Sequence, residues 1–134
     1  MEVFGGFSSD LIKTKGPESF DFIILGNVLC EVPDQQQVLS DIHTLLRKNG
    51  QLFFMEHVAN EDGTFLNKVQ NFLNPVWSVI SDGCNCNRHT LNQIKAFDWK
   101  IESWELHMNS PMAFINRLQV GIATKKEEIN SSKL

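Results

Sequence analysis

The stretch from Phe20 to Val58 constrains the fold most strongly, because it has the pattern of a strand, a helix and a second strand. An unbroken apolar run, Phe22 to Leu25, favours a strand covered on both faces, as in parallel sheets. Apolar residues then recur at helical spacing between an expected N-cap at Asp34 and an expected left-handed C-cap at Gly50. A second apolar run, Leu52 to Met55, completes the unit. The pattern predicts a right-handed parallel crossover.

Polar and small residues follow each of these two apolar runs. Asn27, Val28 and Leu29 come after the first run, and Glu56 and His57 come after the second. Ligands of open α/β sheets bind outside the carboxyl ends of the strands. We therefore expect these five residues to lie at one rim of the sheet and to face a ligand.

The global properties of the chain exclude several classes of protein. With 134 residues, of which 42% are hydrophobic, the chain fits one α/β domain over residues 1–125, followed by a polar disordered tail at 126–134. A net charge of -4 argues against a nucleic-acid partner. The three cysteines form no C-x-x-C pair, which indicates a reducing, cytoplasmic environment. No apolar run approaches the roughly 20 residues that span a bilayer.

Four motifs in the right order carry a family resemblance: LCEV, FFMEHV, NPVWSVISDGCNCNR and SPMAF. The chain resembles the class I S-adenosylmethionine-dependent methyltransferases, and within them the microsomal thiol S-methyltransferase family. The resemblance covers Phe20 to about Lys125. It places Phe20 to Val58 at the fourth strand, the following helix and the fifth strand of that fold.

The resemblance implies a partial Rossmann-like methyltransferase sheet, with parallel strands four and five and a closing antiparallel pair. Gly5 and Gly6 do not form the glycine-rich loop that binds the cofactor in this family, so the first half of the fold is missing from the chain. Without the family's first strand, the strand at Phe20 to Leu25 becomes an edge. We therefore expect a marginally stable chain, self-association through that edge, or a fragment of a longer protein.

Two apolar patterns near the end of the chain predict the closing antiparallel pair. Leu118, Val120 and Ile122 alternate with polar residues, as in a half-buried strand. The pattern from Trp99 to Met108 alternates with a slip at Ser103 and Trp104, which predicts a β-bulge there.

A long apolar pattern from Phe65 to Ile80 predicts a helix capped by Thr64 and kinked at Pro75. One interpretation packs its apolar face on the sheet. The alternatives are a flap over an apolar acceptor pocket and a patch that rests on a membrane surface. Trp77 suits each of them.

Further site residues follow from the resemblance. Asp10 stands near the position of the acidic residue that faces the adenine ring, and Asn27, Val28 and Leu29 would complete the cofactor contacts. Trp77, Asp82, Cys84 and Arg88 are expected to line the acceptor pocket, with loop capping as the alternative for the last three. Cys84 and Cys86 lack a second cysteine pair, so we expect no metal site, and Cys30 is interpreted as buried filler.

The chemistry implied is methyl transfer from S-adenosylmethionine to a small thiol. Such an acceptor reacts as the thiolate, and a nearby base would help to form it. We assign this role to His57, with Glu56 holding its ring or contacting the cofactor; the alternative is that both residues only hydrogen-bond neighbouring loops.

Two functions remain open at this stage. One is a truncated methyltransferase acting on small alkyl thiols. The other is a catalytically inactive remnant that binds a protein partner through its exposed strand. The resemblance also implies that full-length relatives are held on the endoplasmic reticulum or lipid droplets by an apolar N-terminal segment.

Overall fold

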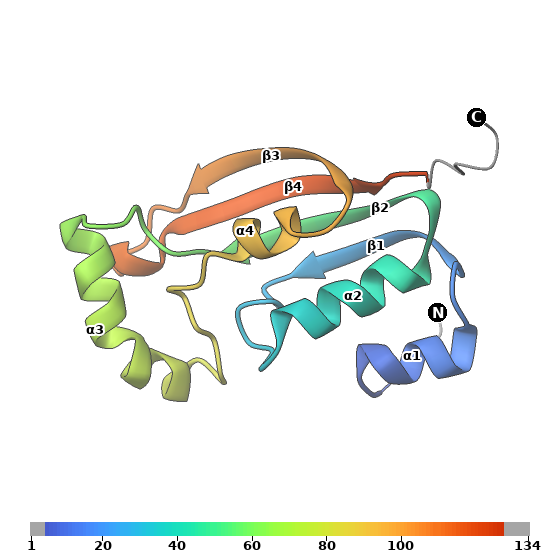
Figure 1. The fold of residues 1–134 in the computed structure, drawn as a ribbon. Coiled ribbons are helices and arrows are strands. Elements are labelled where there is room, and N and C mark those ends of the chain that lie inside the picture. Colours follow the sequence, from blue (N-terminus) through green and yellow to red (C-terminus); the bar gives the residue numbers. More distant parts are fainter. Residues whose placement is uncertain (1–4, 128–134) are drawn as a thin grey trace.

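A computed structural model describes residues 5–127 of the chain (Figure 1). It contains a four-stranded sheet with helices beside it. In chain order the elements are α1 (Ser8–Lys15), β1 (Phe20–Gly26), α2 (Gln35–Leu45), β2 (Leu46–His57), α3 (Phe65–Ile80), α4 (Thr90–Lys95), β3 (Trp99–His107), the short 3₁₀ helix η1 (Ala113–Ile115) and β4 (Arg117–Lys125).

The strands lie in the order β1-β2-β4-β3. β1 and β2 pair in parallel, which confirms the predicted strand-helix-strand crossover. β4 pairs antiparallel with both β2 and β3, so the predicted antiparallel pair is also confirmed. The predicted bulge at Ser103 and Trp104 is wrong, because both residues keep a regular register with β4. Trp104 breaks the alternation because β3 is an edge strand on which Trp104 is 54% exposed.

Helix α2, which connects β1 and β2, begins at the expected residue but ends earlier than the sequence predicts. The Asp34 carboxylate accepts a hydrogen bond from the Gln37 backbone N–H, as an N-cap does. The expected C-cap at Gly50 is wrong, since α2 ends at Leu45 and Gly50 lies within β2. The polar residues between Leu46 and Gln51 are accommodated instead by an irregular register between β1 and β2.

β1 forms one edge of the sheet, and one of its faces is open. Phe22 is 48% exposed and Ile24 is 65% exposed, so the apolar run is not covered on both faces in this structure. An apolar cavity of about 460 Å³ opens between α1, β1 and α2. Phe20, Ile23 and Leu25 of β1 pack against the main core. This core is built from Leu29, Leu39, Ile42, Leu46, Leu52, Phe54, Ile94, Trp99 and Ala123.

The interpretation that packs the apolar face of α3 on the sheet is wrong. The side chains of Phe65, Phe72 and Val79 are each about four-fifths exposed, while Asn67 and Gln70 are buried. The helix extends from one end of the sheet and presents its polar residues to the loops that end β2 and precede β4 (Figure 1). Thr64 caps it as predicted, by accepting from the Asn67 N–H.

The two ends of the described range add little to the sheet. Residues 1–4 lie outside the described residues, residues 5–7 form no strand, and Ser8 begins a helix. Most of the expected polar tail, residues 128–134, also lies outside them. Among the described residues, no helix has both the length and the apolar character needed to cross a membrane.

Candidate functional site

The carboxyl ends of β1 and β2 lie side by side. Gly26 pairs with Met55 in the parallel register, and the Asn27 N–H donates to the Met55 carbonyl over 2.8 Å. This pairing brings Asn27 next to the Glu56 and His57 end of β2. The juxtaposition expected from the two apolar runs is therefore present.

Asn27 turns the chain away from the sheet. Its φ of 53° lies in the left-handed region, which asparagine tolerates better than most residues. Its side-chain oxygen Oδ1 is buried and finds no hydrogen-bond partner among the described residues. Because a buried oxygen without a donor is costly, this atom is suited to accept a hydrogen bond from a bound ligand.

Glu56 holds the turn that follows Asn27. Its side chain is fully buried, and its two oxygens accept from the backbone N–H groups of Val28 over 3.0 Å and Cys30 over 3.3 Å. Burial raises the pKa of Glu56, and the surrounding backbone N–H groups oppose this shift. The geometry favours a positioning role for Glu56 rather than contact with a substrate.

Arg88 fastens a second loop to the same turn. Its Nη1 atom donates to the carbonyls of Leu29 over 2.8 Å and Val32 over 2.6 Å. The Asn85 N–H donates to the Cys30 carbonyl over 2.8 Å. The loop after α3 is thus fixed against the end of β1, with Arg88 as its anchor.

Gln70 joins the remaining segments, and nothing in the sequence singled it out. Its side-chain oxygen accepts from the Asn60 N–H over 2.8 Å. Its Nε2 group donates to the carbonyls of Val58, Cys86 and Phe114, at 3.2, 2.7 and 2.9 Å. A lone glutamine inside an apolar helical pattern carries no signal for such a role. One side chain thereby links the end of β2 to the cysteine loop and to η1.

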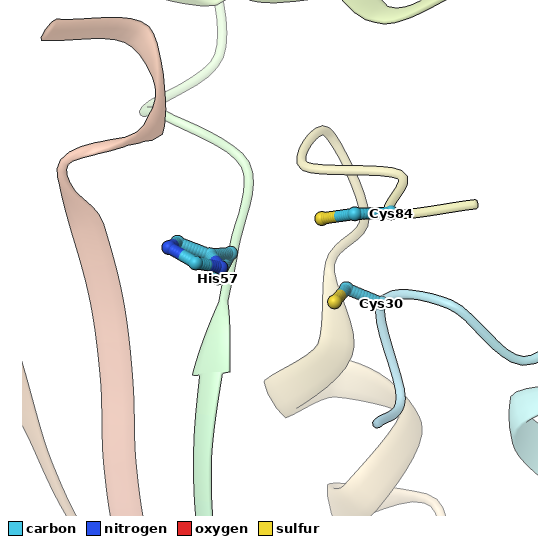
Figure 2. A group of neighbouring side chains, drawn as sticks. All are labelled: Cys30, His57 and Cys84. Carbon is cyan, nitrogen blue, oxygen red and sulfur yellow. The ribbon is translucent and has the colours of Figure 1, made fainter. Parts of the chain in front are cut away.

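These links bring Cys30, His57 and Cys84 together. A ligand atom from each of the three side chains lies within 4.8 Å of the other two. Figure 2 shows the two sulfur atoms, from separate loops, on the side that faces His57 at the end of β2. Within residues 5–127, the buried His57 Nε2 atom has no hydrogen-bond partner. The spacing of these three residues in the sequence gives no metal-binding pattern, so their grouping was not predicted.

The two cysteines of this cluster differ in acidity. The Cys30 thiol, and after it the His57 and Trp77 side chains, hold the pKa of Cys84 below its ordinary value, although burial opposes them. Contact with Cys84 and burial both raise the pKa of Cys30. Cys84 is therefore the first of the pair to ionise. Cys86 points elsewhere, and burial raises its pKa to about 11.

Three more of the expected site residues lie around this cluster, and one lies on its margin. Leu29 is fully buried in the core, and Val28 is partly exposed beside it. Trp77 packs edge-on against Phe114, with ring centroids 5.6 Å apart, beside the cysteines. Asp82 is exposed in the turn after α3, with a φ of 60°.

Asp10 does not join the others. It lies in α1, where its carboxylate accepts from the Phe7 N–H over 3.0 Å and pairs with Lys13 at 3.7 Å. Figure 1 shows α1 beside α2 rather than at the carboxyl ends of the strands. In this structure Asp10 caps its own helix, and its assignment to the cofactor stays a prediction.

A mixed sheet with polar residues at the carboxyl ends of its parallel strands is typical of the α/β folds that bind nucleotide cofactors there. Comparison with known proteins shows which family of α/β folds the chain belongs to. A family model described as "Methyltransferase domain" matches residues 2–103. The chain belongs to this family, within the class I S-adenosylmethionine-dependent methyltransferases.

Curated relatives agree with this assignment. Human thiol S-methyltransferase TMT1A is 31% identical over 96 residues, which cover 72% of this chain and 39% of that protein. Rat thiol S-methyltransferase TMT1B is 34% identical over 84 residues, which cover 63% of this chain and 34% of that protein. The chain thus spans less than half the length of these relatives.

Solved structures share the fold. The YcgJ protein of Bacillus subtilis aligns with a TM-score of 0.62 at 13% identity, over 90% of this chain and 77% of that one. A phosphoethanolamine N-methyltransferase of Haemonchus contortus, solved with S-adenosylhomocysteine, aligns with a TM-score of 0.58 at 12% identity, over 83% of this chain and 35% of that one. At such identities the comparison establishes the fold alone.

Proposed function

We propose that the chain contributes the strand ends of a methyl-transfer site that uses S-adenosylmethionine and takes a small thiol as acceptor. The proposal depends chiefly on one observation: Asn27 Oδ1 and His57 Nε2, two buried atoms that lack hydrogen-bond partners in the described part of the chain, occur on adjacent strand ends. The thiol S-methyltransferase relatives support the choice of acceptor.

Asn27 is the residue of this chain best suited to the methyl donor. The unpartnered Oδ1 accepts a hydrogen bond from a donor group of the bound cofactor. Val28 and Leu29 are the apolar residues of the same turn. When bound, S-adenosylmethionine supplies a methyl group on a sulfonium, which passes to the acceptor by in-line displacement.

His57 and Glu56 divide the remaining work. His57 takes the proton from the acceptor thiol, so that the sulfur attacks as thiolate. Glu56 fixes the Val28 to Cys30 turn and acts by positioning. Trp77 and Phe114 contribute an apolar wall near the acceptor, which keeps water from the thiolate.

Calorimetric titration of the chain with S-adenosylhomocysteine tests the cofactor site. We expect one-to-one binding, weakened about fivefold by Asn27→Gly, because one hydrogen bond contributes about 1 kcal/mol. Glycine is chosen because it keeps the left-handed backbone. The exposed Asn109→Gly is the control and should leave the affinity unchanged. Equal affinities of the two variants would remove Asn27 from the site.

Methylation of a small alkyl thiol tests His57. We expect His57→Ala to lower the rate about 100-fold or more, as loss of a general base does. His107→Ala is the matched control, since His107 is exposed on β3 and pairs with Glu105. A His57→Ala variant as fast as the His107→Ala variant would contradict the proposed role.

A second candidate function is a protein-binding module. It is supported by the edge position of β1 and by the apolar cavity beside that strand. An edge strand offers unpaired backbone groups to a strand from a partner. A folded chain that releases no heat with S-adenosylhomocysteine would favour this function over methyl transfer.

A further inference from the structure

Cys30, His57 and Cys84 form a set of ligands that neither the family assignment nor the relatives' names account for. They come from three separate segments: the turn after β1, the end of β2 and the loop after α3. Two thiols and an imidazole are the ligands that zinc prefers among side chains. Within the described residues, no other group of three or more potential metal ligands comes together in this way.

The distances suit a small ion. Four-coordinate zinc binds sulfur at about 2.3 Å and nitrogen at about 2.0 Å, so its ligand atoms lie about 3.5–3.8 Å apart. The three atoms here all lie within 4.8 Å of one another. Rotating one or two of these side chains so that their ligand atoms move by about 1 Å would bring the three atoms to zinc-binding distance.

The surroundings hold the ligands in place. Cys30 is fixed by the Glu56 carboxylate on its N–H and by Asn85 on its carbonyl. Gln70 donates to the carbonyls of Val58, the residue after His57, and of Cys86, two residues after Cys84. The ring of His57 contributes one nitrogen to the group, and that atom lies within 4.8 Å of both sulfur atoms.

We propose that Cys30, His57 and Cys84 bind a thiophilic divalent ion of the zinc type and leave its fourth position to an acceptor thiol. Three protein ligands with one open position is the arrangement of catalytic rather than structural zinc sites. The second half of the proposal, the thiol in the fourth position, depends on the proposed function.

The step at such a site is balanced without an oxidant. The acceptor thiol loses its proton to solvent as a sulfur–metal bond forms, and the sulfur keeps both electrons. With the ion bound, the ion rather than the free imidazole of His57 stabilises the thiolate. His57 is then a ligand, and it takes the role of base proposed above in the metal-free chain.

Cobalt titration tests the metal site without any methyl donor. We expect the reduced, metal-free chain to bind one Co²⁺, to develop the visible and near-ultraviolet bands of tetrahedral cobalt thiolate, and to lose them when Zn²⁺ displaces Co²⁺. Cys30→Ala and Cys84→Ala should each weaken Co²⁺ binding about 100-fold or more. Loss of a residue that only hydrogen-bonds to a metal ligand already costs about 10–100-fold in metal affinity. Cys86→Ala is the matched control, since Cys86 is equally buried and stands outside the cluster.

Three further measurements complete the test. Circular dichroism establishes that each variant is folded. In the unsubstituted chain, Zn²⁺ should slow the alkylation of Cys30 and Cys84 and leave the alkylation rate of Cys86 unchanged. This measurement does not depend on the folding of any variant. A small alkyl thiol should shift the visible cobalt bands.

Two results would overturn the proposal. The absence of cobalt thiolate bands, or their equal loss in Cys84→Ala and Cys86→Ala, would remove the metal site. If the cobalt bands do not shift when the alkyl thiol is added, the acceptor thiol does not occupy the fourth position. Neither result bears on S-adenosylhomocysteine binding, so the two proposals fail separately.

Discussion

Replacing Gln70 with leucine should lower the free energy of unfolding by about 3–5 kcal/mol. The change leaves the Asn60 N–H and the carbonyls of Val58 and Cys86 without their glutamine partner in a buried region. Each unsatisfied buried group costs about 1–3 kcal/mol, and the larger apolar side chain offsets part of the sum. The Phe114 carbonyl loses less, because Asn60 Nδ2 still donates to it over 3.0 Å.

Urea unfolding followed by circular dichroism measures this loss. Lys68→Leu introduces the same side chain at an exposed position of the same helix and should change stability by less than about 0.5 kcal/mol. If Gln70→Leu unfolds at the same urea concentration as Lys68→Leu, the hydrogen bonds around Gln70 do not hold the loops together.

The parallel crossover could be predicted from sequence because its signals are local. Two short apolar runs and a helical repeat between them leave few other arrangements, and Asp34 marks the helix start. The same reasoning placed Asn27 next to Glu56 and His57, since parallel strands end at one rim. This much of the site follows from strand direction alone.

The role of α3 could not be predicted in the same way. An apolar stripe on a helix normally faces the core, but here the backbone carbonyls of three loops meet the helix instead. Asn67 and Gln70 satisfy these groups, so the polar face is buried and Phe72 is left 82% exposed. Whether a helix faces side chains or loop backbone depends on tertiary contacts.

The cysteine cluster was missed for a related reason. Motif spacing detects ligands that are close in sequence, such as Cys84 and Cys86, whereas the fold selects Cys84 with Cys30 and His57. The pairing depends on Arg88 and Asn85, which carry the loop to the end of β1. The resemblance had suggested Arg88 as an acceptor-pocket residue or a loop cap, and no sequence pattern linked it to the end of β1.

Glu56 is the remaining residue on which the site geometry depends. A carboxylate at the end of a strand suggested contact with the cofactor or with the His57 ring. The structure gives both of its oxygens backbone partners, at Val28 and Cys30. A fully buried carboxylate that accepts two N–H groups stabilises their loop and leaves little capacity for a substrate.

We therefore expect Glu56→Leu to lower the free energy of unfolding by about 2–4 kcal/mol, because two backbone N–H groups lose their acceptor. Glu56→Gln should lose about half as much, since the amide keeps one oxygen and turns its NH₂ group toward the second N–H. Met55→Leu, the adjacent and 39% exposed position, is the control, with less than about 0.5 kcal/mol expected. The measurement is again urea unfolding. Leucine and glutamine variants as stable as the control would show that the turn after β1 is held by other contacts, and Glu56 would return to consideration as a ligand-binding residue.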